Sequence, residues 1–316
     1  MAADQEQPER AGAGAAAQVD DRPALPASRS RAAEVWSAVL ANRLAVAGLV
    51  ILVAIALAAL LGERIAPYGP TEIDFQARLE GPSARHPFGT DQLGRDILSR
   101  VMLGSRISLQ VGFISVGIAL VGGVVLGLIA GFYGGKRDDV IMRVMDILFA
   151  FPAILLAIAV LAILGPGIGN AMIAIGIVYV PIFARVTRAS VLSVREEVYV
   201  RAARSLGASD VRLLRLHVLP NVLAPIIVQT SISLAFAILS EAALSFLGLG
   251  APRPTPAWGL MLAEGRGFIQ QAWWMAFFPG MAILLTVLAF NVLGDALRDA
   301  LDPRQKSAIE SRGVTA

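Results

Sequence analysis

Ionisable side chains are sparse in this sequence, and one group of them stands close together. Asp91, Arg95 and Asp96 occur within six residues. A helix over residues 92–103 would be capped by Asp91 and would let Arg95 pair with a neighbouring carboxylate. Such a helix would also carry an apolar, membrane-facing stripe that includes Ile97. The cluster is then a structural pairing, a gate, or a contact surface for another protein.

Two further polar side chains, Glu241 and Asn291, stand within or at the edge of long apolar stretches. Polar groups in such places pair with a neighbouring helix or contact a substrate, so both are candidates for lining a path. The sequence offers little else for catalysis, because it has no cysteine and only two histidines. A nucleotide-binding Walker A motif is missing too, since the nearest candidate, Gly135-Lys136, lacks both its first glycine and its Ser/Thr.

The segment 195–221 carries five arginines and a distinct pattern of its own. Residues 196–206 favour a helix that stops at Gly207. Ser209 or Asp210 can cap a second short helix, in which Val211, Leu214 and Val218 share a face. Pro220 then suits the first turn of the next long helix. The pattern predicts a helix–turn–helix.

The elements that hold these groups are apolar and long. Of 316 residues, 56% are hydrophobic and 16% are charged, which is typical of a membrane protein. Charge-free stretches predict spans at about 44–62, 111–130, 222–239 and 274–293. The charge-free stretch 147–184 is too long for one span, and its Gly-Pro-Gly break near residue 166 predicts two helices. The chain is therefore predicted to be an all-α integral membrane protein with six transmembrane helices.

The distribution of basic residues predicts the orientation. With both ends inside, the cytoplasmic segments carry 19 of the 27 lysines and arginines, and the outer segments carry eight. This bias favours cytoplasmic N- and C-termini in the plasma (inner) membrane. The predicted organisation is a disordered tail (1–32), an anchor helix (33–63), an extracytoplasmic loop (64–104), a transmembrane domain (105–297) and a C-terminal tail (298–316).

The segment 195–221 resembles the EAA loop of permease subunits of binding-protein-dependent ABC importers. Ala202, Ala203, Gly207 and the Leu219-Pro220 pair match that pattern in spacing, while Arg201 stands at its Glu position and His217 at its Ile position. In the family, this loop seats on the ATPase subunit. The resemblance implies the following coupling residues: Tyr199, Arg201, Ala202, Ala203, Leu206, Gly207, Ala208, Asp210, His217, Leu219 and Pro220.

Four further segments, at 86–109, 131–152, 241–266 and 289–304, resemble the C-type subunit of the dipeptide/oligopeptide/nickel permease family. The resemblance implies a type I ABC importer transmembrane-domain (MetI-like) fold. It also implies a B-type permease partner, two ATPase subunits that hold ATP and Mg, and an extracytoplasmic substrate-binding protein. Membrane lipid is a further partner and nucleic acid is not. The implied function is import of di- or oligopeptides, with no cofactor, metal or catalytic residue in this chain.

Other interpretations of the same features differ in what they require. The segment 195–221 could be a DNA-binding helix–turn–helix or a solvated basic face that sets topology, but long apolar stretches flank it closely on both sides. An ion-coupled secondary transporter would place ionisable groups near the bilayer midplane, whereas the middles of all six predicted spans are uncharged. An intramembrane hydrolase would need a nucleophile with a base, and no histidine lies within a span.

Overall fold

The computed structural model describes residues 31–301, which fold into helices joined by loops. The predicted disordered tail, apart from residues 31 and 32, and the predicted C-terminal tail beyond residue 301 lie outside the described residues. The helices are α1 (Arg31–Ala41), α2 (Arg43–Ile65), η1 (Phe75–Ala77), α3 (Ile97–Tyr133), α4 (Gly135–Phe149), α5 (Ala153–Leu164), α6 (Ile168–Val194), α7 (Val198–Ser205), α8 (Asp210–Leu213), η2 (Leu214–Val218), α9 (Leu219–Phe246), α10 (Trp258–Arg266) and α11 (Trp274–Leu301).

Five helical stretches of the described chain are long and apolar enough to cross a membrane, namely α2, α3, α6, α8–α9 and α11. A sixth span is present if α4 and α5 are counted together, although these two helices meet at an angle of 94°. The sequence predicted one helix between residue 147 and the Gly-Pro-Gly break, and this was wrong, because the structure interrupts the helix at residues 150–152. The bend has a local cause, because Pro152 disfavours helical backbone at the residue before it and ends α4.

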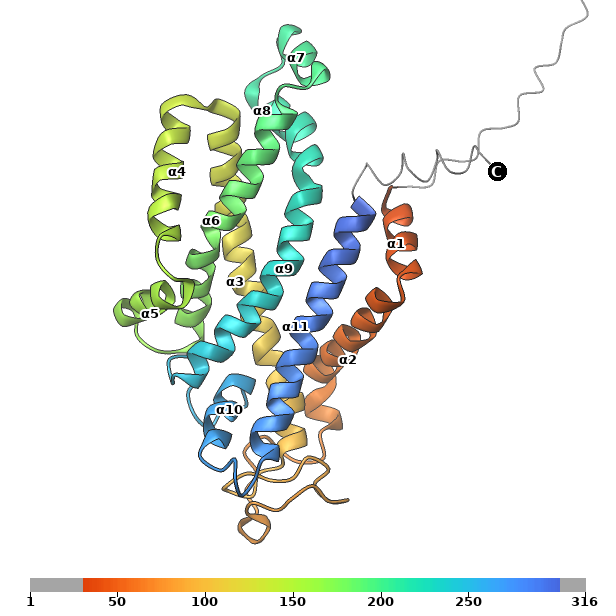
Figure 1. Cartoon of the computed structure of the whole chain (residues 1–316), viewed down its shortest axis with the longest axis vertical. Helices are drawn as coiled ribbons and strands as arrows, with labels where there is room; N and C mark the ends of the chain where they lie inside the picture. Colours follow the sequence, from red (N-terminus) through yellow and green to blue (C-terminus); the bar gives the residue numbers. More distant parts are fainter. Residues whose placement is uncertain (1–30, 302–316) are drawn as a thin grey trace, which may run out of the picture.

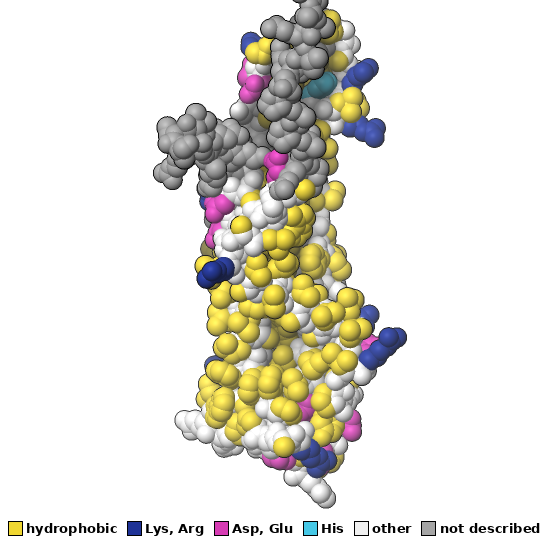
Figure 2. Space-filling model, turned by 90° about the vertical axis from the view of Figure 1, so that its right-hand side faces the viewer, with side chains coloured by type: hydrophobic (Ala, Val, Ile, Leu, Met, Phe, Trp, Pro, Cys, Tyr) yellow, Lys and Arg dark blue, Asp and Glu magenta, His cyan; other side chains and the backbone are white. Residues whose placement is uncertain are grey.

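The molecule is elongated along its long helices (Figure 1). The short helices α7 and α8 lie at one extremity, which we call the α7 end. The opposite extremity, the α10 end, is formed by α10 and the loop 66–96. The first described helix, α1, and the last turns of α11 both lie toward the α7 end. Hydrophobic side chains cover the middle of the face shown in Figure 2, and charged side chains gather toward its two ends, as expected for a protein that crosses a bilayer.

The core of the bundle is the close contact between α3 and α6. Gly123, Gly127 and Gly131 of α3 face α6, and a Cβ added to Gly127 would lie 2.5 Å from the carbonyl oxygen of Ala184. Small residues in one row let two helix backbones approach, which is how membrane helices gain packing energy without a hydrophobic driving force. Gly117, on the same helix, faces open space instead.

Candidate functional site

The segment between α6 and α9 projects beyond the bundle at the α7 end (Figure 1). Helix α7 ends at Ser205, and Gly207 follows with a φ of 83°, a conformation that favours glycine. The hydroxyl of Ser209 then accepts a hydrogen bond from the Arg212 N–H at 3.4 Å and caps α8. The helix stop at Gly207 and the Ser209 cap both agree with the sequence pattern.

One face of this segment is buried against the ends of the membrane helices. Val200, Leu213 and Val218 are fully buried and pack with Phe132 of α3 and Val191 of α6. The Arg204 guanidinium lies 5.1 Å above the Phe132 ring, which adds a cation–π contact. The segment is therefore docked on the bundle rather than hanging from it.

The other face is open and strongly apolar at its tip. The Leu206 side chain is 89% exposed and Val211 is 72% exposed. Val211 was predicted to share one face with Leu214 and Val218. In the structure Val218 is buried and Val211 is exposed, and Leu213 takes the inward position beside Val218. An apolar tip held out in water is characteristic of a contact surface for another protein.

The predicted coupling residues divide between the open face and its edge. Ala203, Ala208, His217 and Leu219 are half-buried, and the exposed ones are Tyr199, Arg201, Ala202, Leu206, Gly207, Asp210 and Pro220. The rings of Tyr199 and His217 lie 6.3 Å apart. Partial burial, and then the nearby Glu197 carboxylate, raise the pKa of Tyr199, so its phenol stays neutral at physiological pH.

The second half of the segment leads into the membrane without a break. Helix α8 continues through the π-helical turn η2 directly into α9, so that Asp210–Phe246 is one helical stretch of 37 residues. The sequence pattern suggested a separate short helix before Pro220. Pro220 lies in the first turn of α9, as predicted, and because the helical stretch runs through it, its missing N–H leaves one intrahelical hydrogen bond unmade beside the π-helical turn.

At the α10 end, the predicted charged cluster is present but buried. Asp91 binds Arg95 through Oδ2 and Nε at 2.5 Å, and also accepts a hydrogen bond from the Arg95 backbone N–H. Asp96 accepts from the Ser99 backbone and hydroxyl at 2.7 Å, and its other oxygen lies 3.0 Å from His86 Nδ1. All three predicted residues are inside the folded loop, where fully paired groups hold one arrangement.

The helix that begins here starts later than predicted. Asp96, not Asp91, caps α3, and the helix begins at Ile97. Gly94 has a φ of 78°, which is outside the helical region, so no helix runs through residues 92–96. Ile97 is buried, not membrane-facing as the predicted stripe required.

Three partners of this network were missed from the sequence. Glu264 of α10 accepts from Arg95 at 3.3 Å, from Arg100 at 3.5 Å and from Arg253 at 3.1 Å. Arg100 also donates to the carbonyl oxygens of Pro70 and Pro254. The network thus joins the loop 66–96, α3 and α10. The sequence signal for this network was Arg100, a charged residue near the start of an apolar helix. Its partner could not be predicted, because Glu264 lies 164 residues away in the sequence.

The two candidate path-lining residues have different surroundings. Glu241 of α9 is buried, and its Oε1 accepts a hydrogen bond from the Ser245 hydroxyl at 2.7 Å. The other carboxyl oxygen of Glu241 has no hydrogen-bond partner among the described residues. Asn291 is half-buried on α11. Glu241 and Asn291 make no hydrogen bond with each other. Glu241 is buried among the helices and is not on an exposed face.

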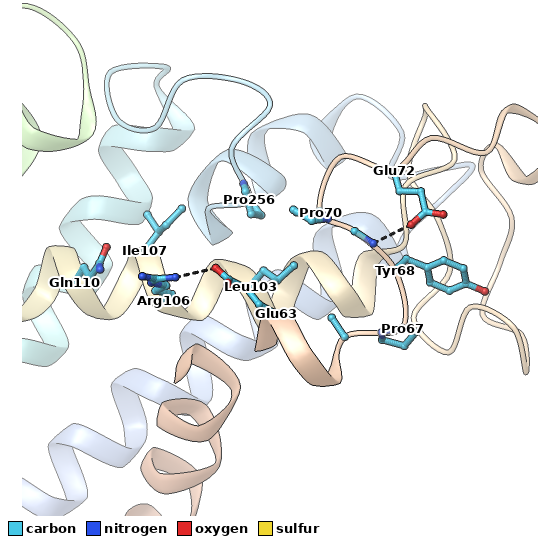
Figure 3. A pocket seen from close by; sticks show the side chains of 12 residues that line it. Glu63, Pro67, Tyr68, Pro70, Glu72, Leu103, Arg106, Ile107, Gln110 and Pro256 are labelled. Atoms are coloured by element: carbon cyan, nitrogen blue, oxygen red, sulfur yellow. Dashed lines mark hydrogen bonds and ion pairs between the residues drawn. The ribbon is translucent and has the colours of Figure 1, made fainter. Parts of the chain in front are cut away.

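At the α10 end, a cleft of about 670 Å³ lies between α2, α3 and the loop after α2 (Figure 3). Glu63, at the end of α2, pairs with Arg106 of α3 at 2.9 Å. Glu72 accepts a hydrogen bond from the backbone N–H of Gly69 at 2.9 Å. No group of three or more acidic or histidine side chains suited to a metal ion occurs in the described part of the chain.

A bundle of apolar helices with a docked, outward-facing helical segment at one end defines a multi-pass membrane permease. The fold is that of type I ABC importers. A solved subunit of the MetNI methionine ABC transporter superposes with a TM-score of 0.54 at 19% identity, covering 64% of this chain and 96% of that chain.

Two family models match the sequence. "Binding-protein-dependent transport system inner membrane component" matches residues 123–307, and "N-terminal TM domain of oligopeptide transport permease C" matches residues 30–82. The chain belongs to the family of inner membrane components of binding-protein-dependent transport systems. It is therefore a permease subunit of an ABC importer and not an enzyme, and it works with ATPase and substrate-binding partners.

Several curated relatives cover most of the chain. The dipeptide transport system permease protein DppC of Alkalihalophilus pseudofirmus is 53% identical over 84% of this chain and 88% of its own length. The di/tripeptide permease DppC of Pseudomonas aeruginosa is 50% identical, covering 87% and 93%. The glutathione permease GsiD of Pectobacterium atrosepticum is 48% identical, covering 87% and 91%.

Proposed function

We propose that this chain forms half of the translocation path of a peptide importer and pairs with a B-type permease subunit. Relatives that share about half of its residues are named for dipeptides and for di- and tripeptides, which supports short peptides as the substrate class. Two ATPase subunits would supply ATP and Mg, and an extracytoplasmic binding protein would deliver the peptide. The N- and C-termini would be cytoplasmic, as the excess of basic residues in those segments favours.

The observation that carries the proposal is the docked segment at the α7 end. Its open face presents Leu206 and Arg201 to a partner, while Leu213 and Val218 fix its other face to the bundle. When the ATPase subunits close, a push on α7 and α8 would pass through η2 into α9 along one continuous helical stretch. The same helical connection would let α9 change its tilt and switch access to the path.

A matched pair of glycines tests this coupling. Gly207 and Gly248 both have positive φ, and a Cβ added at either meets nothing within 4 Å. Gly207→Asp and Gly248→Asp therefore impose a similar backbone strain, one at the α7 end and the other at the far end of α9. We expect only Gly207→Asp to lose ATPase subunits on co-purification and to abolish stimulation of ATP hydrolysis by the binding protein. Equal loss in both variants would contradict the proposed docking site.

The substrate class is tested separately, in vesicles that contain the assembled importer. Uptake of a labelled dipeptide should require ATP and the binding protein, and an unlabelled dipeptide should compete. Uptake without ATPase subunits would instead indicate an ion-coupled transporter, and competition by glutathione but not by dipeptides would place the chain with its glutathione relative.

A further inference from the structure

Two clefts at the α10 end adjoin each other, because they share two lining residues. The 670 Å³ cleft described above and a second cleft of about 500 Å³ both include Arg106 and Gln110 of α3. The second cleft continues along α2 and α3 into the charge-free part of both helices. Its walls are otherwise apolar, and they consist of Ala56, Ala59, Leu60, Leu109, Phe113 and Ile114.

Taken together, the two adjoining clefts, which we call the groove, have a polar head and an apolar tail. The change occurs at the Glu63–Arg106 ion pair, which marks the boundary of the membrane, because the charge-free stretch of α2 ends at Gly62 and that of α3 begins at Ile107. Side chains of the pair are 75% and 57% exposed, so no other part of the described chain covers them.

The polar head holds charges of both signs, and several of its donor and acceptor atoms are unpaired within the described chain. Arg106 uses only one guanidinium nitrogen, bound to Oε1 of Glu63, and its other nitrogens make no hydrogen bond with the described chain. One carboxylate oxygen of Glu63 and one of Glu72 are likewise unpaired there, as is the Gln110 amide. Figure 3 shows Glu63 and Arg106 side by side, with Glu72 and Tyr68 further along the cleft.

We propose that this groove binds one phosphatidylethanolamine molecule. The free guanidinium nitrogens of Arg106 would bind the lipid phosphate, since arginine recognises phosphate through paired N–H donors. Glu63 and Glu72 would accept hydrogen bonds from the primary ammonium, and one acyl chain would lie over Ala59 between α2 and α3. Phosphatidylglycerol offers no cation to the two carboxylates, so the charges of the head favour the zwitterionic lipid.

A peptide would also present an ammonium and a carboxylate to the polar head, but it would leave the apolar tail empty. Helix α2 also makes a lipid a natural occupant, because only 11% of its apolar window is buried within the chain. A lipid seated there would fill the seam between α2 and the rest of the bundle and fix α2 against α3.

The test uses the full chain, alone and co-purified with its second permease subunit, from bilayers containing equal phosphatidylethanolamine and phosphatidylglycerol. Native mass spectrometry counts the lipids that are retained. Arg106→Gln removes the phosphate contact, and Ala59→Phe fills the tail. Arg85→Gln, in the exposed Arg85–Asp74 pair of the same end, and Ala54→Phe, on the exposed face of α2, are matched controls.

We expect one retained phosphatidylethanolamine per chain in both preparations. Retention should fall about tenfold, or about 1.4 kcal/mol, in Arg106→Gln and in Ala59→Phe, and should be unchanged in the two controls. Retention of both lipids in their bulk ratio would overturn the proposal. So would lipid retention that is unchanged in Arg106→Gln and Ala59→Phe, or that is lost when the second permease subunit is bound. Displacement of the lipid by excess dialanine would also overturn it and would assign the cleft to peptide.

Discussion

Arg188 of α6 donates two hydrogen bonds to Asp138 of α4, from Nε to Oδ1 at 2.5 Å and from Nη2 to Oδ2 at 2.6 Å. A second pair, Arg185–Asp146 at 2.7 Å, lies two turns further along α4. Helix α4 is thus fastened to α6 by charges at both ends, although it turns away sharply into α5. The two ion pairs therefore fix the α4 side of the bend between α4 and α5.

Asp138→Asn should loosen α4 from α6. The substitution keeps the shape of the side chain but removes the charge that strengthens both hydrogen bonds, at a cost of about 1 kcal/mol in a half-exposed pair. The thermal unfolding midpoint of the detergent-solubilised chain should fall. Asp139→Asn, at an exposed neighbour that makes no bond with Arg188, is the control and should leave the midpoint unchanged.

Gly127→Ala should destabilise the bundle by about 2 kcal/mol, because the added methyl meets the Ala184 carbonyl oxygen and the Thr187 side chain. Gly117→Ala, on the same helix, meets nothing and should be neutral or stabilising by up to about 1 kcal/mol. Unfolding midpoints of the two variants compare them directly. A similar change in both would argue against backbone contact between α3 and α6.

Glu264→Gln should cost about 3 kcal/mol, since it leaves Arg95 and Arg100 buried with one carboxylate in place of two. We expect poor expression and a lowered unfolding midpoint. Arg253→Gln removes a partner of the same carboxylate whose side chain is 71% exposed, and should cost less than about 1 kcal/mol. If Arg253→Gln were the more harmful change, the buried network would not be what holds the loop to α10.

Arg201→Ala should separate stability from partner binding. The Arg201 side chain is exposed and makes no hydrogen bond or ion pair with the described residues, so the free energy of unfolding should stay within about 0.5 kcal/mol of the original. Under the proposed function, recovery of ATPase subunits should fall. Arg201→Lys, which keeps the charge, serves as the control and should retain more of the partner than Arg201→Ala.

The transmembrane spans could be predicted because each is a charge-free stretch of the right length, which is a property of the local sequence alone. The bend at Pro152 was missed for the same reason, since an uncharged run looks continuous whether its helix is straight or broken. The start of α3 was misplaced because Asp91 and Asp96 both suit a helix cap. Gly94, between them, was the residue that decides the choice, through its positive φ.

The candidate sites were predicted unevenly. The helix stop at Gly207 is local, so residue types and spacing sufficed. The inward position of Leu213 depends on Phe132 and Val191, which lie on other helices. Likewise Arg95 could be predicted to pair with a carboxylate close to it in sequence, which is Asp91, whereas Glu264 reaches the same site only through the tertiary fold.

The uninterrupted stretch from Asp210 to Phe246 has a mechanical consequence. At 1.5 Å per residue, its 37 residues make a rod of roughly 55 Å. If that stretch pivots as one body about its midpoint by about 5°, each tip moves through roughly 2.4 Å, in opposite directions. A small sideways displacement of the tip at the α7 end would thus appear, reversed, beside Glu241 and Ser245 at the other end of α9.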